Sequence, residues 1–316
     1  MRLEEQLRAV IRRKHYSYKT EETYVGWYKR YVLWHGKRHP AEMGAGEVEA
    51  FLTHLAVNRG LVAVTQNQAL NALVFLYEQV LCKPLEGINA MRAKHHKRLP
   101  VVLSREETGA LLRGVEGPAG LVCRLLYGCG LRVAEGLALR VKDVDLAGGK
   151  LEVRGGKGDR DRVVTLPRSL VEPLKMHRET VKLSHEADRR EGQPGVWLPG
   201  ALEEKLPHAG ESWPWYWMFP SRNVATDPRT GVVRRHHLHD LAVSRELARA
   251  GKLAGLEKKV TAHTLRHSFA THLILRGVDI RSIQELLGHA DVRTTKVYTQ
   301  LARAMRGEIT SPLDDL

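Results

Sequence analysis

Residues 261–272 read TAHTLRHSFATH, and this stretch places two basic side chains three positions apart. If a helix begins at Thr261, His263 and Arg266 project from the same face, because residues three apart are neighbours on a helix. The free N–H groups at such a helix start also favour an anion. Taken alone, the stretch is equally consistent with a basic helix face that binds nothing. His267 and His272 do not have the spacing of a metal motif such as HExxH.

A second basic motif lies upstream at residues 128–136, which read GCGLRVAEG. Arg132 and Glu135 are three residues apart and share a face if a helix starts here. On its own, such a pair is usually a surface ion pair.

Between these motifs the sequence predicts a β-hairpin. Residues 150–154 and 161–166 alternate as two strands, and residues 155–159, GGKGD, form the turn between them. The turn holds Lys157 at its tip, but the GxxxxGK[ST] spacing of a phosphate-binding loop is absent. A solvated lysine is the alternative interpretation.

The C-terminal part returns to helical periodicity. Residues 279–289 read DIRSIQELLGH, which predicts a helix that ends at Gly288 and leaves His289 at its end. Asp291 is the expected cap of a following helix that carries Tyr298. A tyrosine in such a helix is ordinarily a packing residue.

Together these segments supply two arginines, a lysine, two histidines and a candidate nucleophile, without a carboxylate cluster for Mg²⁺. Fixed cations neutralise phosphate oxygens, a tyrosine attacks phosphorus, and lysine or histidine moves protons. The combined set therefore favours phosphoryl transfer without a metal or other cofactor.

Composition agrees with a polyanionic partner. The 316 residues include 50 basic and 36 acidic side chains, a net charge of +14, which favours nucleic acid over a membrane surface. A merely basic soluble enzyme is the alternative. No apolar run is long enough to span a membrane, no signal segment is recognisable, and three cysteines match no disulfide or metal framework. We expect a reduced, cytoplasmic protein.

The chain is expected to form two domains. Residues 1–91 show helical periodicity, with segments near 4–14, 46–55 and 65–80 and a helix capped by Thr20. Residues 92–100 form a basic linker closed by proline, and residues 101–316 form a mixed domain that opens with a capping box at Ser104. We therefore expect a mainly α fold with a small β-sheet in the second domain. The basic linker side chains are candidates for phosphate contacts: Arg92, Lys94, Lys97 and Arg98.

Residues 211–219, ESWPWYWMF, concentrate aromatic side chains in a chain that is 6% aromatic. If the segment is extended, Trp213, Trp215 and Trp217 share one face together with Phe219, while Met218 and Tyr216 face the other way. Exposed aromatic rings stack on unpaired bases. We expect Trp215 to stack on such a base or to support the pocket that takes it; a core strand is the alternative.

The chain resembles the tyrosine recombinase, or phage-type integrase, family in the order of six residues: Arg132, Lys157, His263, Arg266, His289 and Tyr298. The motifs GLRVAEG, HTLRHSFATHL and ELLGHADVRTTKVYT carry the resemblance, which covers essentially the whole chain. It implies a C-shaped clamp around duplex DNA, in which residues 1–91 form the core-binding half.

The resemblance also implies a role for each of these residues. Arg132 and Arg266 clamp the scissile phosphate, and His289 hydrogen-bonds to it. Lys157 protonates the leaving 5′-oxygen and His263 acts as an acid or base. Tyr298 is the nucleophile that forms a 3′-phosphotyrosyl link. Glu135 orders the site.

Within the family the chain looks like an integron integrase. Residues 190–222 include an extra insertion, and residues 37–44 and 227–237 also match that subfamily. The likeness implies recombination of gene cassettes at folded single-stranded hairpins and at a duplex integration site by a homotetramer. It makes four residues candidates for DNA contacts: Trp215, Pro228, His236 and His237.

The tail, residues 301–316, departs from the subfamily. Its members run through a glycine-rich stretch after the nucleophile, whereas this chain has LARAMRG at residues 301–307. The tail is expected to pack on a neighbouring protomer. Other interpretations remain: a recombinase of ordinary duplex sites, a DNA-binding protein that does not cleave, a type IB topoisomerase or a metal-dependent nuclease.

Overall fold

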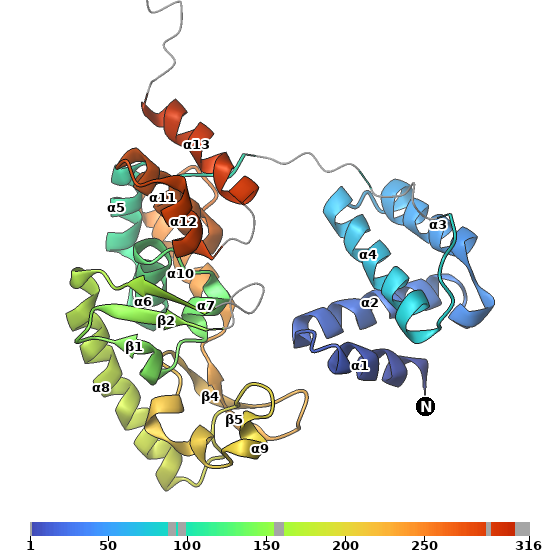
Figure 1. Cartoon of the computed structure of the whole chain (residues 1–316), viewed down its shortest axis with the longest axis horizontal. Coiled ribbons are helices and arrows are strands. Elements are labelled where there is room, and N and C mark those ends of the chain that lie inside the picture. The colour runs from blue at the N-terminus through green and yellow to red at the C-terminus, as the bar shows by residue number, and fades with distance from the viewer. Residues whose placement is uncertain (1, 88–92, 94–98, 155–160, 289–291, 307–316) are drawn as a thin grey trace, which may run out of the picture. The chain divides into compact units, whose positions relative to one another are not determined.

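The computed structural model describes residues 2–87, 93, 99–154, 161–288 and 292–306. By its contacts the chain divides into two compact units, residues 1–98 and 99–316 (Figure 1). Each unit has its own hydrophobic core. No described helix is both long and apolar enough to cross a bilayer.

All regular elements described in the first unit are helices. Its four α-helices are α1 (Leu3–Arg13), α2 (Tyr18–Trp34), α3 (Ala45–Thr53) and α4 (Ala63–Phe75), and short π-helical turns extend the last two. The core between them is aromatic as well as aliphatic. Tyr31 and Tyr77 are fully buried and share a hydrogen bond of 2.9 Å between their hydroxyls, so neither buried hydroxyl is left unsatisfied.

The expected start of the second helix is wrong by three residues. Ser17 rather than Thr20 is the N-cap of α2, and its hydroxyl accepts a hydrogen bond from the Thr20 backbone N–H at 3.2 Å. Both residue types are good caps. Helix α2 therefore begins almost one full turn earlier than expected.

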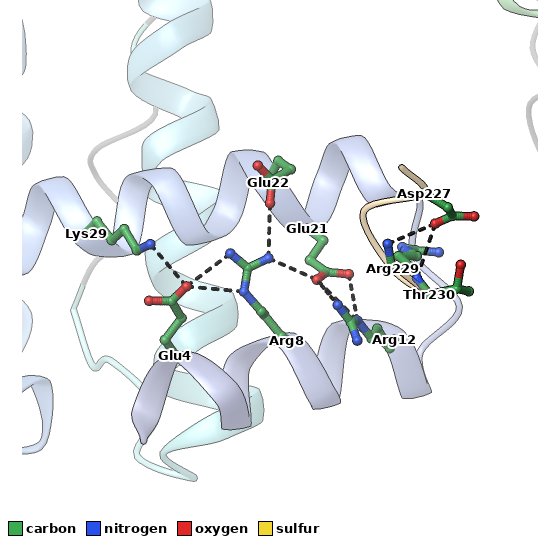
Figure 2. A network of polar contacts seen from close by, with 9 residues as sticks. All are labelled: Glu4, Arg8, Arg12, Glu21, Glu22, Lys29, Asp227, Arg229 and Thr230. Atoms are coloured by element: carbon green, nitrogen blue, oxygen red, sulfur yellow. Dashed lines mark hydrogen bonds and ion pairs between the residues drawn. The ribbon is translucent and has the colours of Figure 1, made fainter. Parts of the chain in front are cut away.

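An ion-pair network ties α1 to α2 around Glu21, whose side chain is fully buried (Figure 2). Arg8 and Arg12 reach it at 3.0 and 2.8 Å, and Arg8 also binds Glu4 and Glu22. A buried carboxylate needs such partners, because an unpaired one costs several kcal/mol. The network therefore fixes the angle between the first two helices.

The second unit holds nine α-helices among its described residues. They are α5 (Arg105–Gly114), α6 (Gly117–Gly128), α7 (Val133–Leu137), α8 (Arg168–Arg190), α9 (Leu202–Lys205), α10 (Asp240–Leu253), α11 (Ala262–Leu275), α12 (Ile280–Leu287) and α13 (Val292–Arg306). The capping box expected at Ser104 is present at the start of α5. Helix α11 packs against α6, α12 and α13 (Figure 1), so it lies among the helices that carry the basic motifs.

The strands form two small antiparallel sheets. The first has the order β1 (Val144–Asp145), β2 (Lys150–Val153), β3 (Arg162–Thr165), and the second pairs β4 (Pro220–Thr226) with β5 (Val233–His237). The expected hairpin is present as β2 and β3, with Val153 opposite Arg162. The prediction of a mainly α fold with a small sheet in the catalytic part is confirmed.

The aromatic segment is not an extended strand, and the prediction that its tryptophans share one face is wrong. Trp213–Trp215 is a 3₁₀ turn with Pro214 near its start, where the fixed φ of proline suits a turn better than a paired strand. After the turn, Tyr216, Trp217, Met218 and Phe219 are all buried. Met218 and Phe219 both enter the main core instead of facing opposite ways.

Asp188, on α8, connects the aromatic segment of residues 211–219 to β5. Its buried carboxylate accepts two hydrogen bonds from Arg235, at 2.6 and 2.5 Å, and one from the Tyr216 hydroxyl at 2.6 Å. In the turn between β4 and β5, Asp227 accepts from the backbone N–H of Arg229 and of Thr230 (Figure 2). Such an Asx turn is formed by local hydrogen bonds alone. The tip of this hairpin is therefore stabilised by its own residues, and its base is held by Asp188.

Candidate active site

Arg132 and Glu135 stand at the start of α7, where the chain turns sharply after Gly130. Gly130 has φ +63°, and a Cβ there would lie 2.4 Å from the ring of Phe269, so no other residue fits without rearrangement. The Glu135 carboxylate accepts from the Arg132 backbone N–H at 2.8 Å and from its Nη1 at 2.6 Å. The pair is thus a helix cap as well as an ion pair.

A third residue, Arg162 on β3, also binds the Glu135 carboxylate. Its Nη1 and Nη2 donate to the two oxygens of Glu135 at 3.0 and 2.7 Å. Burial acts to raise the pKa of Glu135, but hydrogen bonds from Arg162 and Arg132 outweigh it and hold the pKa at about 2. Glu135 is therefore a carboxylate at any physiological pH.

Arg266, on α11, lies on the other side of Glu135, with Nη1 3.7 Å from the carboxylate. It is nearly fully buried and donates to the carbonyls of Gly130 and Leu287, each at 2.5 Å. Burial, with the charge of Arg132, lowers its pKa to about 10. It remains a cation at neutral pH, with further N–H donors besides these two.

The same three arginines also hold the end of α12. Each donates to one of three consecutive carbonyls: Leu286 accepts from Arg162 at 2.9 Å, Leu287 from Arg266 at 2.5 Å and Gly288 from Arg132 at 3.3 Å. Gly288 has φ +60° and ends the helix as predicted. Cations suit the negative end of a helix dipole, so the arginines fix where α12 stops.

Tyr298 is 3% exposed and lies on α13. Its hydroxyl is 2.8 Å from Nδ1 of His267, the residue after Arg266 on α11. Burial raises the pKa of Tyr298, against the opposing charges of Arg266 and Arg132. The hydroxyl is therefore protonated at neutral pH and lies within the field of both arginines.

His263 is one turn before His267 on α11, with their ring centres 6.1 Å apart. Its ring is exposed at the helix start. Partial burial and the charges of Arg266 and Arg132 lower its pKa, so the neutral imidazole predominates at neutral pH.

The structure thus brings together four of the predicted residues, Arg132, Glu135, Arg266 and Tyr298, with His263 beside them. The predicted Lys157 and His289, and the expected cap Asp291, lie outside the described residues. So do the four linker candidates, Arg92, Lys94, Lys97 and Arg98.

Sequence reasoning missed Arg162 and His267. Arg162 lies on the same inward face of β3 as buried Val164. A charged residue at an inward position of a strand is a signal that it has a buried partner. His267 follows His263 at helical spacing, and the sequence suggests for it only a metal-ligand role, which the motif spacing does not support. Among the described residues, no three His, Cys, Asp or Glu side chains cluster closely enough to hold a metal ion.

The remaining candidate DNA contacts lie in the aromatic segment and in the hairpin of β4 and β5. Lys142 lies on the ring of Trp215, with Nζ 2.8 Å from its centre, and Arg140 lies 4.0 Å from the centre of Trp217. Such contacts are cation–π interactions. They leave Trp215 half-buried, so part of its ring surface is still available.

Two histidines of β5 lie beside Trp217. The ring centres of His236 and His237 are 5.6 and 5.2 Å from that of Trp217, and burial lowers the pKa of His237 to about 4. His237 is therefore neutral at neutral pH. Pro228 is exposed in the turn at the tip of the β4–β5 hairpin, whereas His237 pairs with Pro220 at its base.

Comparison with known proteins gives two family matches that together span most of the chain. Residues 103–305 match the model of the phage integrase family, and residues 3–87 match that of the phage integrase N-terminal SAM-like domain.

Individual relatives agree with these matches. An integrase/recombinase of Escherichia coli is 48% identical over 313 residues, covering 99% of this chain and 93% of the relative. The tyrosine recombinase XerA of Thermococcus kodakarensis is 34% identical and covers 89% of this chain and 84% of its own. The Tn1549 transposon integrase in complex with circular intermediate DNA superposes with a TM-score of 0.61 over 97% of this chain and 99% of its own, at 16% identity, which is a likeness of fold.

Proposed function

Since the chain belongs to the phage integrase family and is a site-specific tyrosine recombinase, we propose that it is an integron integrase. It integrates and excises gene cassettes by cleaving and rejoining DNA through a 3′-phosphotyrosyl intermediate. Its substrates are folded single-stranded cassette hairpins and a duplex integration site.

The observation that carries the chemical proposal is the buried Tyr298 hydroxyl in the field of two arginines. Arg132 and Arg266 bind the scissile phosphate through their guanidinium groups, each of which carries five N–H donors. Guanidinium groups fixed before substrate arrives stabilise the charge that develops on phosphate oxygens without reorganising. The chemistry then needs no metal.

The remaining roles follow from the family likeness. Lys157 donates the proton to the leaving 5′-oxygen, His289 hydrogen-bonds to the phosphate, and His263 moves protons at the site. Glu135 takes no part in bond making. It holds the arginines in place through the contacts described above.

The domains are proposed to divide the work of binding. Residues 1–91 form the core-binding domain, residues 92–100 are a linker that follows phosphates, and residues 101–316 form the catalytic domain. DNA is the partner, and four protomers act together on two sites. The net charge of +14 supports a polyanionic partner.

The inserted region is proposed to recognise the hairpin through bases that leave the stack. Trp215 offers a partly exposed ring, and Pro228, His236 and His237 belong to the β4–β5 hairpin. A base stacking on Trp215 either uses the ring face away from Lys142 or replaces the Lys142 ammonium. Stacking of this kind contributes about 1–3 kcal/mol per base and tolerates any base.

One incubation tests the substrate proposal. The full chain is mixed with a labelled single-stranded cassette hairpin and, separately, with the perfect duplex of the same sequence. Adducts that resist denaturant are then counted in buffer with EDTA. Adduct on the hairpin supports the proposal. Adduct on the cassette duplex alone would show instead a recombinase of ordinary duplex sites, and adduct that requires a divalent ion would contradict the metal-free chemistry.

A further inference from the structure

The hydroxyl of Tyr298 has a hydrogen-bond partner in the resting protein that the family assignment does not give a role. Nδ1 of His267 lies 2.8 Å from it, and their ring centres are 5.5 Å apart. The contact joins α11 to α13, and Tyr298 belongs to a small apolar cluster that includes Ala270 and Leu287. The distance is therefore a product of helix packing.

The protonation states allow the Tyr298 hydroxyl to donate to Nδ1 of His267, in the imidazole tautomer that carries its proton on Nε2. Tyr298 keeps its proton at neutral pH, because burial raises its pKa. Burial and the charges of His263 and Arg266 lower the pKa of His267 to about 4, so its imidazole is neutral. A neutral imidazole whose Nδ1 faces a hydroxyl can accept the hydroxyl proton.

We propose that His267 is a catalytic residue of the cleavage step, which takes the proton from the Tyr298 hydroxyl as its oxygen attacks phosphorus. This inference rests on the proposed function. The bond from the Tyr298 oxygen to phosphorus forms, and the bond from phosphorus to the 5′-oxygen breaks. The Tyr298 proton moves to Nδ1 of His267, and the 5′-oxygen takes a proton from Lys157. Rejoining reverses each transfer, so the protons balance over the cycle.

The arrival of DNA strengthens the acceptor at the step that needs it. Without substrate, the charge of Arg266 disfavours a positive charge on His267, and Arg266 and Arg132 both lie close enough to act on Tyr298. A bound phosphodiester neutralises these arginines and adds negative charge beside the imidazole, which favours the imidazolium form. The imidazole is thus a weak proton acceptor in the resting protein and a stronger one once phosphate is in place.

This assignment separates the two histidines of α11. His263 is exposed at the helix start, a position suited to contact with DNA. His267 lies one turn further into the helix, where its hydrogen bond is to the nucleophile. The first therefore acts on the substrate and the second on Tyr298.

The test uses His267→Asn, because an Asn amide can hydrogen-bond from nearly the Nδ1 position but is not basic. Cleavage is timed on two substrates, one natural and one in which sulfur replaces the bridging 5′-oxygen. A thiolate leaves without a proton, so the sulfur substrate needs no acid on the leaving side. We expect His267→Asn to be slowed by about 10²- to 10⁴-fold on both substrates, and Lys157→Ala to recover on the sulfur substrate only.

His272→Asn is the matched control on the same helix. His272 is buried and bonds to the Tyr127 hydroxyl and the Leu103 carbonyl, so this variant loses packing without touching Tyr298. It should lower Tm and still cleave within a few-fold of the unmodified chain. Equal losses of Tm and rate in both variants would show that His267 only supports the helix, which overturns the proposal.

Two further outcomes decide the matter. Recovery of His267→Asn on the sulfur substrate would place His267 on the leaving side, and an unchanged rate would remove it from the chemistry. Tyr298→Phe is run beside them to separate this inference from the proposed function. An adduct formed by Tyr298→Phe contradicts the proposed function itself, whereas its absence, with normal cleavage by His267→Asn, contradicts the proton transfer alone.

Discussion

Glu135 is a carboxylate with three guanidinium groups around it, and its role is to hold these groups in position. Arg132 and Arg162 hydrogen-bond to it and Arg266 lies 3.7 Å away. A buried charge of this kind contributes little net stability on its own, but removing it leaves its partners uncompensated. The residue therefore sets the positions of the arginines that we propose bind phosphate.

The pH dependence of stability tests this role. The folded pKa of about 2 is below the ordinary value of 4.5, so the stabilisation is fully present above pH 4.5 and is lost as the pH falls through about 2. The lowering corresponds to about 3 kcal/mol. We expect Glu135→Gln to reduce the free energy of unfolding by about that amount at pH 7, measured by urea unfolding.

At low pH the same comparison supplies its own control. Once Glu135 is protonated it is as neutral as Gln, so the difference between the two proteins should shrink between pH 4.5 and 2. A difference that stays constant over this range would show that the charge of Glu135 is not what stabilises the fold.

At the scale of elements, the three arginines determine where helix α12 ends. Three consecutive carbonyls accept hydrogen bonds from arginines that come from α7, β3 and α11. The residue after this turn is His289, so the arginines that we propose bind phosphate also fix the point where the chain leaves α12 toward it. One set of side chains thus connects four separate segments of the sequence.

Substitution of Arg162 tests this connection. Arg162→Met removes two hydrogen bonds to Glu135 and one to Leu286 from a side chain that is 9% exposed. We expect a loss of about 2–4 kcal/mol in the free energy of unfolding and slower adduct formation. Arg162→Lys keeps the charge, yet a single ammonium cannot reproduce the forked contact, so it should recover less than half of the loss. Full recovery by lysine would mean that charge alone matters.

Local contacts in this site were predictable from the sequence, and distant ones were not. Arg132 and Glu135 are three residues apart, and the helix start that joins them is visible in the glycines before it. Arg162 meets Glu135 across 27 residues, through sheet register and helix packing that no short window contains. In the aromatic segment a local pattern misled the prediction. The alternation of tryptophans indicated a strand, whereas Trp213–Trp215 forms a turn that contains Pro214.

At the scale of the whole molecule, two units with separate cores carry a common positive charge. That charge attracts any nucleic acid, so it contributes affinity but no substrate specificity. Substrate specificity must come from surfaces that are not simply rich in lysine and arginine. We propose that the aromatic segment with its partly exposed Trp215, together with the β4–β5 hairpin, is such a surface.

Trp215→Ala should separate the two kinds of substrate. We expect hairpin binding to weaken by about 5- to 150-fold, the equivalent of about 1–3 kcal/mol, while binding of a perfect duplex changes little, measured by gel shift at fixed salt. Trp213→Ala is the neighbouring control, because its ring packs on His185 and Tyr216. Equal weakening on both substrates by Trp215→Ala would remove this residue from hairpin recognition.

The central claim is that Tyr298 becomes joined to DNA, and peptide mapping of the covalent adduct tests it most directly. The adduct is trapped by denaturant, digested with protease and nuclease, and analysed by mass spectrometry. We predict a nucleotide attached through its 3′-phosphate to the peptide that contains Tyr298, and no adduct from Tyr298→Phe. A nucleotide on any other residue, or an undiminished adduct from Tyr298→Phe, would contradict the account.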